Sequence, residues 1–363
     1  MPHMSYGKIS IELKRASALE VAETAQSPAD TEKKIQKAVA RVMTIYKPQR
    51  IFTNAHINTV YHSQVLNVSD LIYARKRFEL EDGDFLDLDW SCVGGKSIAV
   101  ILHGLESSAG RPYMKGMAKA LNDSGIDALC VNFRGCGGQP NRLLRFYHSG
   151  DTGDVRQIIS HVSEKMDYEN IFMVGFSLGA NVLLKFLGEE GTNALGGYGI
   201  AKAAAVSVPC DLASASRALD SQKNIVYRKR FLKKLGNTLE RKKETHPGEI
   251  DLSGFEKIRT LKEYDDIYTS VLHGFSDSDD YYKKASSKPY LQEIRVPALI
   301  INALDDPFLG KECYPDENAK SESDYIEWTV TKFGGHVGFS RTGNGPFWHE
   351  ERICGHFTDS LGI

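Results

Sequence analysis

The chain has 363 residues, of which 41% are hydrophobic and 25% charged, as expected for a globular protein with a large core. Its 45 basic and 47 acidic residues leave a net charge of −2, so no overall field favours nucleic acid or an anionic membrane as partner. The sequence lacks both an apolar signal-peptide core at its start and an apolar run of the roughly 18 residues that a transmembrane helix needs, so we expect a cytoplasmic protein without stable membrane insertion.

Residues 1–48 are polar and charged and are predicted to form a helical extension. Between Thr31 and Tyr46 the hydrophobic residues follow helical spacing, at Ile35, Val39, Val42 and Ile45. This helix would either pack on the main body or act as an arm that binds a partner. The segment 50–61 that follows mixes polar and apolar residues irregularly, and its pattern assigns it no role.

Residues 49–211 are predicted to be the first part of an α/β core. Alternating segments at Arg77–Leu80 and Phe85–Trp90 flank an Asp-Gly pair, which predicts a β-hairpin. After it come short, continuously apolar runs that alternate with helical segments, a pattern typical of a mostly parallel central sheet flanked by helices. The core resumes over residues 290–363. The runs are Ile98–Leu102, Ala128–Phe133, Ile171–Val174, Ala203–Val208, Ala298–Ala303 and Tyr325–Val330.

Residues 212–289 interrupt this pattern and are predicted to be a helical cap insertion. An insertion that leaves the sheet at this point lies at the edge where open α/β folds bind ligands. Its basic stretches, 227–235 and 241–243, would contact a membrane or an acidic substrate, or simply form the solvated face of a helix.

The stretch from Val174 to Asn181 carries the pattern Gly-x-Ser-x-Gly between an apolar run and a helical segment. This is the context of a nucleophile elbow, in which Ser177 lies at the tip of a tight turn and glycines at both flanks avoid clashes. The backbone N–H of Leu178 would then face a developing oxyanion. The simpler alternative is a strand-to-helix turn in which Ser177 only caps the helix.

A serine nucleophile needs a base and an acid that orients the base, in the chain order Ser, acid, His. His336 stands between glycines after the last predicted strand, and an Asp-Asp-Pro sequence follows the strand before it. We favour Asp306 as the acid because it directly precedes the turn, with Asp305 capping that turn. Both aspartates could instead serve only turn formation.

A second oxyanion donor is expected just after the first parallel strand. Gly104 allows close approach of the backbone there, and the N–H of Leu105 is the predicted donor. His103 is expected to brace this loop rather than act as a base. The glycine-rich stretch 134–138 lacks the spacing of a phosphate-binding loop, and Cys136 has neither a nearby base nor an elbow.

The six cysteines are scattered without a C-x-x-C pair, which indicates reduced thiols rather than a disulfide framework or a zinc site. We therefore expect no metal from this pattern.

Several motifs in one order resemble the YheT-like branch of the α/β-hydrolase family, over the chain from about Arg50 to the C-terminus. The resemblance implies Ser177 as nucleophile, Asp306 as acid and His336 as base, in an esterase or lipase without metal or organic cofactor. Some relatives cleave monoacylglycerol or phospholipid esters, and some fungal ones transfer medium-chain acyl groups to ethanol. The motifs lie at residues 54–59, 103–108, 132–142, 147–150, 175–181, 263–266, 273–275, 280–282, 305–308 and 334–339.

Together these features predict a serine hydrolase of carboxylic esters that works through an acyl-enzyme. The expected partner is a small-molecule ester, lipids included, and not nucleic acid. Three alternatives use the same fold: an acyltransferase to an alcohol, a non-catalytic ligand-binding protein, and a peptidase.

Overall fold

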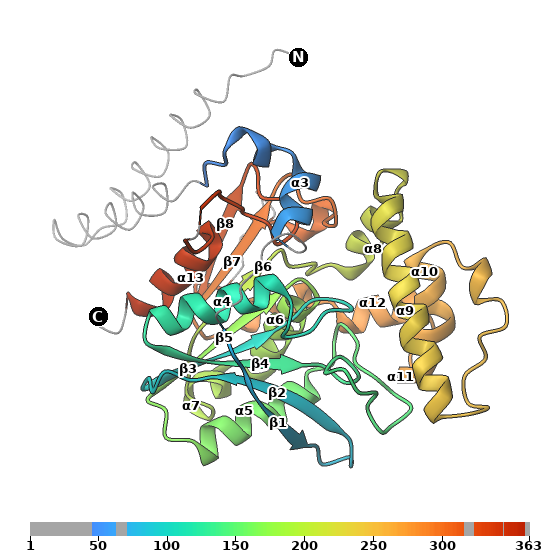
Figure 1. The fold of residues 1–363 in the computed structure, drawn as a ribbon, viewed down its shortest axis with the longest axis horizontal. Coiled ribbons are helices and arrows are strands. Elements are labelled where there is room, and N and C mark those ends of the chain that lie inside the picture. Colours follow the sequence, from blue (N-terminus) through green and yellow to red (C-terminus); the bar gives the residue numbers. More distant parts are fainter. Residues whose placement is uncertain (1–45, 63–70, 316–322, 344, 360–363) are drawn as a thin grey trace. The chain divides into compact units, whose positions relative to one another are not determined.

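The computed structural model of the chain describes residues 46–62, 71–315, 323–343 and 345–359 (Figure 1). The chain divides into two units, residues 1–47 and 48–363. Nearly all of the first unit lies outside the described residues, and so, except for its last residue, does the helix predicted over Thr31–Tyr46. The second unit, which holds the site, is described by itself.

Eight described strands form one sheet in the order β1-β2-β4-β3-β5-β6-β7-β8. β2 pairs antiparallel with both β1 and β4, and every neighbouring pair from β4 to β8 is parallel. The predicted hairpin and the mostly parallel sheet are therefore confirmed. The strands are β1 (Ala74–Glu79), β2 (Phe85–Ser91), β3 (Ser97–Leu102), β4 (Ile126–Asn132), β5 (Asn170–Phe176), β6 (Ile200–Val206), β7 (Ala298–Ala303) and β8 (Ile326–Thr331).

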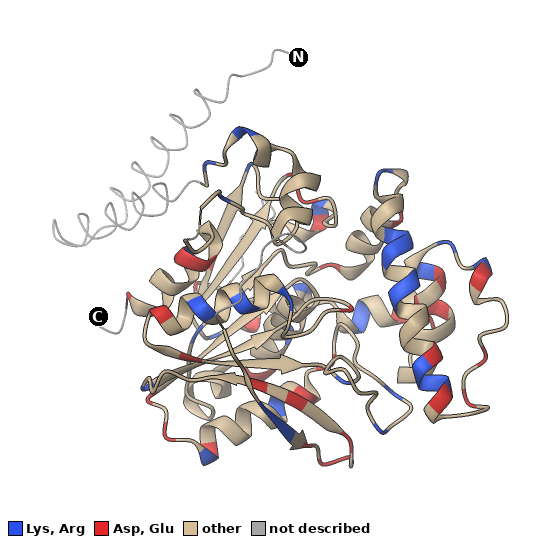
Figure 2. Cartoon of the chain, in the orientation of Figure 1, with Lys and Arg blue, Asp and Glu red and all other residues tan. Residues whose placement is uncertain are grey.

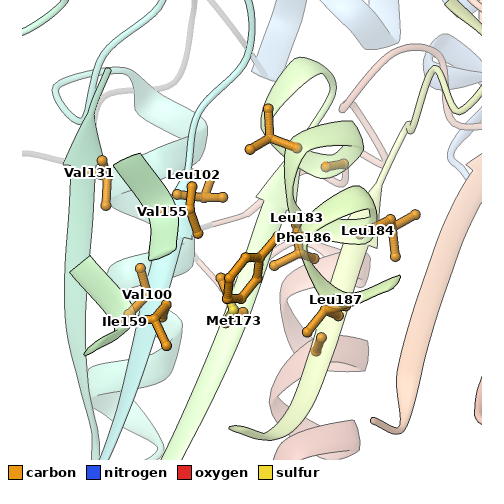
Figure 3. Close-up of a cluster of buried hydrophobic side chains, with 14 of the residues drawn as sticks. Val100, Leu102, Val131, Val155, Ile159, Met173, Leu183, Leu184, Phe186 and Leu187 are labelled. Carbon is orange, nitrogen blue, oxygen red and sulfur yellow. The ribbon is translucent and has the colours of Figure 1, made fainter. Parts of the chain in front are cut away.

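Helices cover both faces of this sheet, which is why its central strands are largely apolar and mostly buried on both sides. All six residues of β3 are buried. On one face, α5 (Gly153–Lys165) and α6 (Leu178–Glu190) pack against alternate residues of the strands, with Val155 beside Leu102 and Ile159 beside Val100 (Figure 3). On the other, α4 (Pro112–Asp123) packs against β4 and α13 (Trp348–Thr358) against β6 and β7.

Residues 212–289, between β6 and β7, are largely helical. Many of their apolar side chains, with Phe146, form a hydrophobic cluster separate from that of the sheet. Lys and Arg recur along α9 (Figure 2). Buried Lys242 of this helix donates hydrogen bonds to Asn141 Oδ1 (2.6 Å) and the Leu143 carbonyl (2.6 Å), and so ties α9 to the core. The helices are α8 (Leu212–Asp220), α9 (Ile225–Thr245), α10 (Leu261–Tyr264), α11 (Ser270–His273) and α12 (Ser278–Ala285).

Two further short α-helices are α3 (Ala55–Val60) and α7 (Thr192–Gly196). Among the described residues, no helix is both long and apolar enough to cross a membrane.

Candidate active site

Ser177 occupies the turn between β5 and α6, with φ 51° and ψ −118°. A Cβ added to Gly175 would lie 2.6 Å from the Cα of Ala180, and one added to Gly179 would lie 2.5 Å from the carbonyl oxygen of Leu102. Both flanking glycines are thus required by close packing, as the elbow pattern predicts. The Ser177 side chain makes no capping hydrogen bond to α6, so the structure contradicts the helix-cap alternative.

The Ser177 hydroxyl instead belongs to a chain of hydrogen bonds. Its Oγ lies 2.9 Å from His336 Nε2, and His336 Nδ1 lies 2.9 Å and 3.1 Å from the two carboxylate oxygens of Asp306. Because a carboxylate only accepts, the proton sits on Nδ1, and Nε2 is free to accept from the serine. Asp306 and His336 are only 5% and 9% exposed. The structure thus brings the three predicted residues together.

The two aspartates after β7 have different partners. Asp306 faces His336 and also accepts a hydrogen bond from the N–H of Phe308 (2.8 Å). Asp305 turns toward the histidine loop and accepts the N–H of Gly335 (2.9 Å). Burial raises the pKa of Asp305, and the adjacent charge of Asp306 adds to this effect. Asp305 therefore braces the loop, a contact that the turn pattern alone does not reveal.

Sequence reasoning missed the residues that hold His336 in place. Its N–H donates to Thr59 Oγ1 (2.9 Å) on α3, and the N–H of Val337 donates to Ser207 Oγ (2.9 Å) at the end of β6. Val337 itself has φ 55°, an unfavourable conformation for a β-branched residue. The segment 50–61, to which the pattern assigned no role, is thus the support of the histidine loop. A hydroxyl within the otherwise apolar run Ala203–Val208 was the available signal for Ser207.

The opposite side of Ser177 presents backbone donors. The N–H of Gly104 donates a hydrogen bond to the hydroxyl of Tyr113 (3.0 Å), and the N–H of Glu106 donates one to the hydroxyl of Tyr147 (2.8 Å). Between them, the N–H of Leu105 has no hydrogen-bond partner among the described residues, and neither has that of Leu178, the first residue of α6. A Cβ on Gly104 would lie 3.2 Å from the Ser177 Cβ, so this loop closely approaches the serine. Both predicted oxyanion donors are therefore free to bind a ligand.

His103 is fully buried behind this loop. Its Nδ1 donates to the carbonyl of Gly104 (2.7 Å), and its Nε2 accepts the N–H of Phe133 (3.2 Å). Burial lowers the pKa of His103 to about 4, which keeps the ring neutral, as these two contacts require. The expected bracing role of His103 agrees with these contacts.

Ser177 and His336 open into a pocket whose far wall is α9. Tyr227 and Phe231 of α9 contact Phe308, with ring centroids 4.8 Å and 5.8 Å apart, and Phe308 lies 4.3 Å from the His336 ring. Aromatic side chains thus connect the helix to the histidine.

Three cations line the same pocket, Arg111, Arg230 and Lys234. Burial lowers the pKa of Lys234, and the repulsion of the other two lowers it further. Glu106 is the one carboxylate among the described residues that line the pocket. The pocket is therefore positively charged.

No metal-binding group of histidine, cysteine and carboxylate ligands is found among the described residues that line this pocket. The structure does place one such group elsewhere, at His62, His349 and Glu350.

Comparison with known proteins agrees with this architecture. A family model described as alpha/beta hydrolase fold matches residues 100–339. The putative esterase YheT of Escherichia coli is 34% identical over 322 residues, which cover 86% of this chain and 93% of that protein. The monoacylglycerol lipase of Saccharomyces cerevisiae is 29% identical over 269 residues, 71% of this chain and 58% of that protein.

Solved structures resemble the chain in fold. The Pyrococcus furiosus esterase Pf2001 superimposes with a TM-score of 0.53 at 18% identity, over 86% of this chain and 98% of that one. These findings confirm the predicted fold and support the expected hydrolase class. The chain belongs to the α/β-hydrolase family, in the branch that includes YheT.

Proposed function

We propose that this protein is a serine hydrolase that cleaves carboxylic esters through an acyl-enzyme. The single observation that carries the proposal is the hydrogen-bonded chain from Ser177 through His336 to Asp306 at the floor of an open pocket. Similarity to the putative esterase YheT and to a monoacylglycerol lipase supports esters as the substrate class.

In this mechanism His336 Nε2 removes the hydroxyl proton of Ser177 as Oγ attacks the ester carbonyl. The resulting oxyanion accepts the N–H groups of Leu105 and Leu178, and loss of one such donor typically costs roughly 3 kcal/mol of transition-state stabilisation. His336 then passes the proton to the leaving alcohol and activates a water that hydrolyses the acyl-enzyme. Asp306 holds the imidazole in the required tautomer and stabilises its cation.

The charge of the pocket bears on which ester is bound. Arg111, Arg230 and Lys234 line the same pocket as Ser177, and Glu106 is the one carboxylate of that lining in the described part of the chain. An ester whose alcohol part carries a phosphate or carboxylate would relieve the repulsion among these cations. In this proposal residues 212–289 act as a cap, with the aromatic side chains of α9 against the substrate.

Fluorophosphonate labelling read by intact mass tests the proposal. We expect a single adduct on the wild type and on Ser107→Ala, a control that changes another serine lining the pocket, and none on Ser177→Ala. An unlabelled wild type, under conditions in which a control esterase reacts, would overturn the hydrolase proposal and favour a ligand-binding role. Analysis of products with added ethanol then separates hydrolysis from acyl transfer to the alcohol.

A further inference from the structure

A second group of chemically reactive side chains lies away from the pocket. His62 follows α3, whereas His349 and Glu350 belong to the first turn of α13. Each of the three is at most 1% exposed. One ligand atom from each residue lies within 4.8 Å of those of the other two.

These atoms have no hydrogen-bond partner among the described residues. His62 Nδ1 donates to the carbonyl of Val337 (2.5 Å), so its Nε2 carries a lone pair, and no partner meets it. One oxygen of Glu350, Oε2, accepts the N–H of Phe347 (2.7 Å), whereas Oε1 is unpartnered. Both ring nitrogens of His349 are unpartnered as well.

Aromatic rings surround the group, and they offer no hydrogen bonds to replace those that water would make. The ring of His62 lies 4.3 Å from that of Phe347, and the ring of His349 lies 5.6 Å from Phe339 and 6.0 Å from Phe176. Buried polar atoms without partners are costly, so natural proteins rarely keep several at one point. Something that the residues described here do not supply must bind them.

The distance between His62 and Glu350 fits a shared cation better than a direct contact. His62 Nε2 and Glu350 Oε1 are 3.8 Å apart, which is too long for a hydrogen bond. Two ligands bound to one zinc ion at about 2.0–2.2 Å stand roughly 3.3–3.8 Å apart, depending on the angle. In addition, the other ring nitrogen of His62 donates its N–H to a backbone carbonyl, and a hydrogen bond of this kind usually supports a metal-bound histidine.

We propose that His62, His349 and Glu350 bind one zinc ion. Imidazole and carboxylate ligands suit this cation, and two histidines with one glutamate are a known zinc ligand set. Gly116 of α4 makes room for the carboxylate, since a Cβ there would lie 2.3 Å from Glu350 Oε1. The ion would join the end of α3 to α13.

The position of this site gives it a structural role in the histidine loop. The carbonyl of Val337, the residue after His336, accepts a hydrogen bond from His62. The N–H of the same residue donates to Ser207. A zinc ion that fixes the His62 ring would therefore fix the loop at Val337. This role needs no contact between the metal and the substrate.

Zinc content is the first test. The full-length wild type, expressed with added zinc and desalted, should hold about one zinc ion per chain by elemental mass spectrometry. His349→Leu should hold at least about tenfold less, because one of three protein ligands is lost. His356→Leu is the matched control, since His356 is also buried on α13 with an unpartnered Nε2 but lies outside the group.

Two results would overturn the proposal: a folded wild type without zinc above the buffer blank, or equal zinc in the two variants. If His349→Leu fails to fold, X-ray absorption at the zinc edge of the wild type decides in its place. We expect two imidazoles and a carboxylate around the metal, and a sulfur shell or an all-oxygen shell would refute the site. Fluorophosphonate labelling of the same samples tests the hydrolase proposal by itself. A failure of the zinc proposal can therefore be distinguished from a failure of the hydrolase proposal.

Discussion

The two walls of the pocket are built differently. On the sheet side, Ser177 and His336 stand at the carboxyl ends of strands, and hydrogen bonds from other elements fix each of them. On the helical side, Tyr227 and Phe231 of α9 are half-buried and contact Phe308 through their rings, whereas Arg230 is exposed. Because catalysis requires atoms held to a fraction of an ångström, the fold places the reacting groups on the sheet. The helix can vary its side chains without moving those groups.

The largest effect should come from the sheet side, at Asp306. In Asp306→Asn the amide can donate to His336 Nδ1, which then stabilises the wrong tautomer and leaves Nε2 unable to accept the serine proton. We expect kcat for a p-nitrophenyl ester to fall by about ten-thousand-fold, with little change in KM. Steady-state kinetics measures both.

Asp305→Asn is the matched control for this change. The amide oxygen can still accept the N–H of Gly335, so kcat should fall by less than about tenfold. If the Asp305 variant lost more activity than the Asp306 variant, our assignment of the acid would be reversed.

An intermediate effect is expected at the support of the histidine loop. Ser207→Ala removes the acceptor for the N–H of Val337, a residue already strained at φ 55°. We expect kcat to fall by roughly ten- to a hundredfold, since small displacements of the base are costly. Ser207→Thr keeps a hydroxyl and should restore much of kcat, whereas a purely steric role for Ser207 predicts that threonine is the worse variant.

This contrast between the walls also separates what the sequence could predict from what it could not. Val174–Asn181 predicts the elbow because strand, glycines and helix are all local in the chain. The parallel sheet follows in the same way from apolar runs such as Ile98–Leu102. Contacts between segments far apart in the chain could not be predicted, among them those of Thr59 with His336 and of Ser207 with Val337. The group of His62, His349 and Glu350 was missed for the same reason, because a search by cysteine spacing considers only local patterns. The division of the chain into core and cap stays a prediction.

The smallest effect should arise on the helical wall and should depend on the substrate. Arg230 lines the pocket, whereas Lys229, next to it on α9, does not. At a separation of about 8 Å in water, reversing one exposed charge changes its interaction with an anionic ester by about 1 kcal/mol, or roughly fivefold in KM. Arg230→Glu should therefore raise KM for an ester with a phosphate or carboxylate on its alcohol part and leave KM for a neutral ester of equal acyl length unchanged. Lys229→Glu carries the same change of net charge and should affect neither, particularly above 0.1 M salt, where the Debye length is about 10 Å.

Equal losses in both variants would mean that the whole field of α9, and not a contact in the pocket, selects the substrate. A loss of kcat in Arg230→Glu would instead mean that the helical wall helps to position the reacting groups. That result would contradict our inference that the sheet side alone positions them.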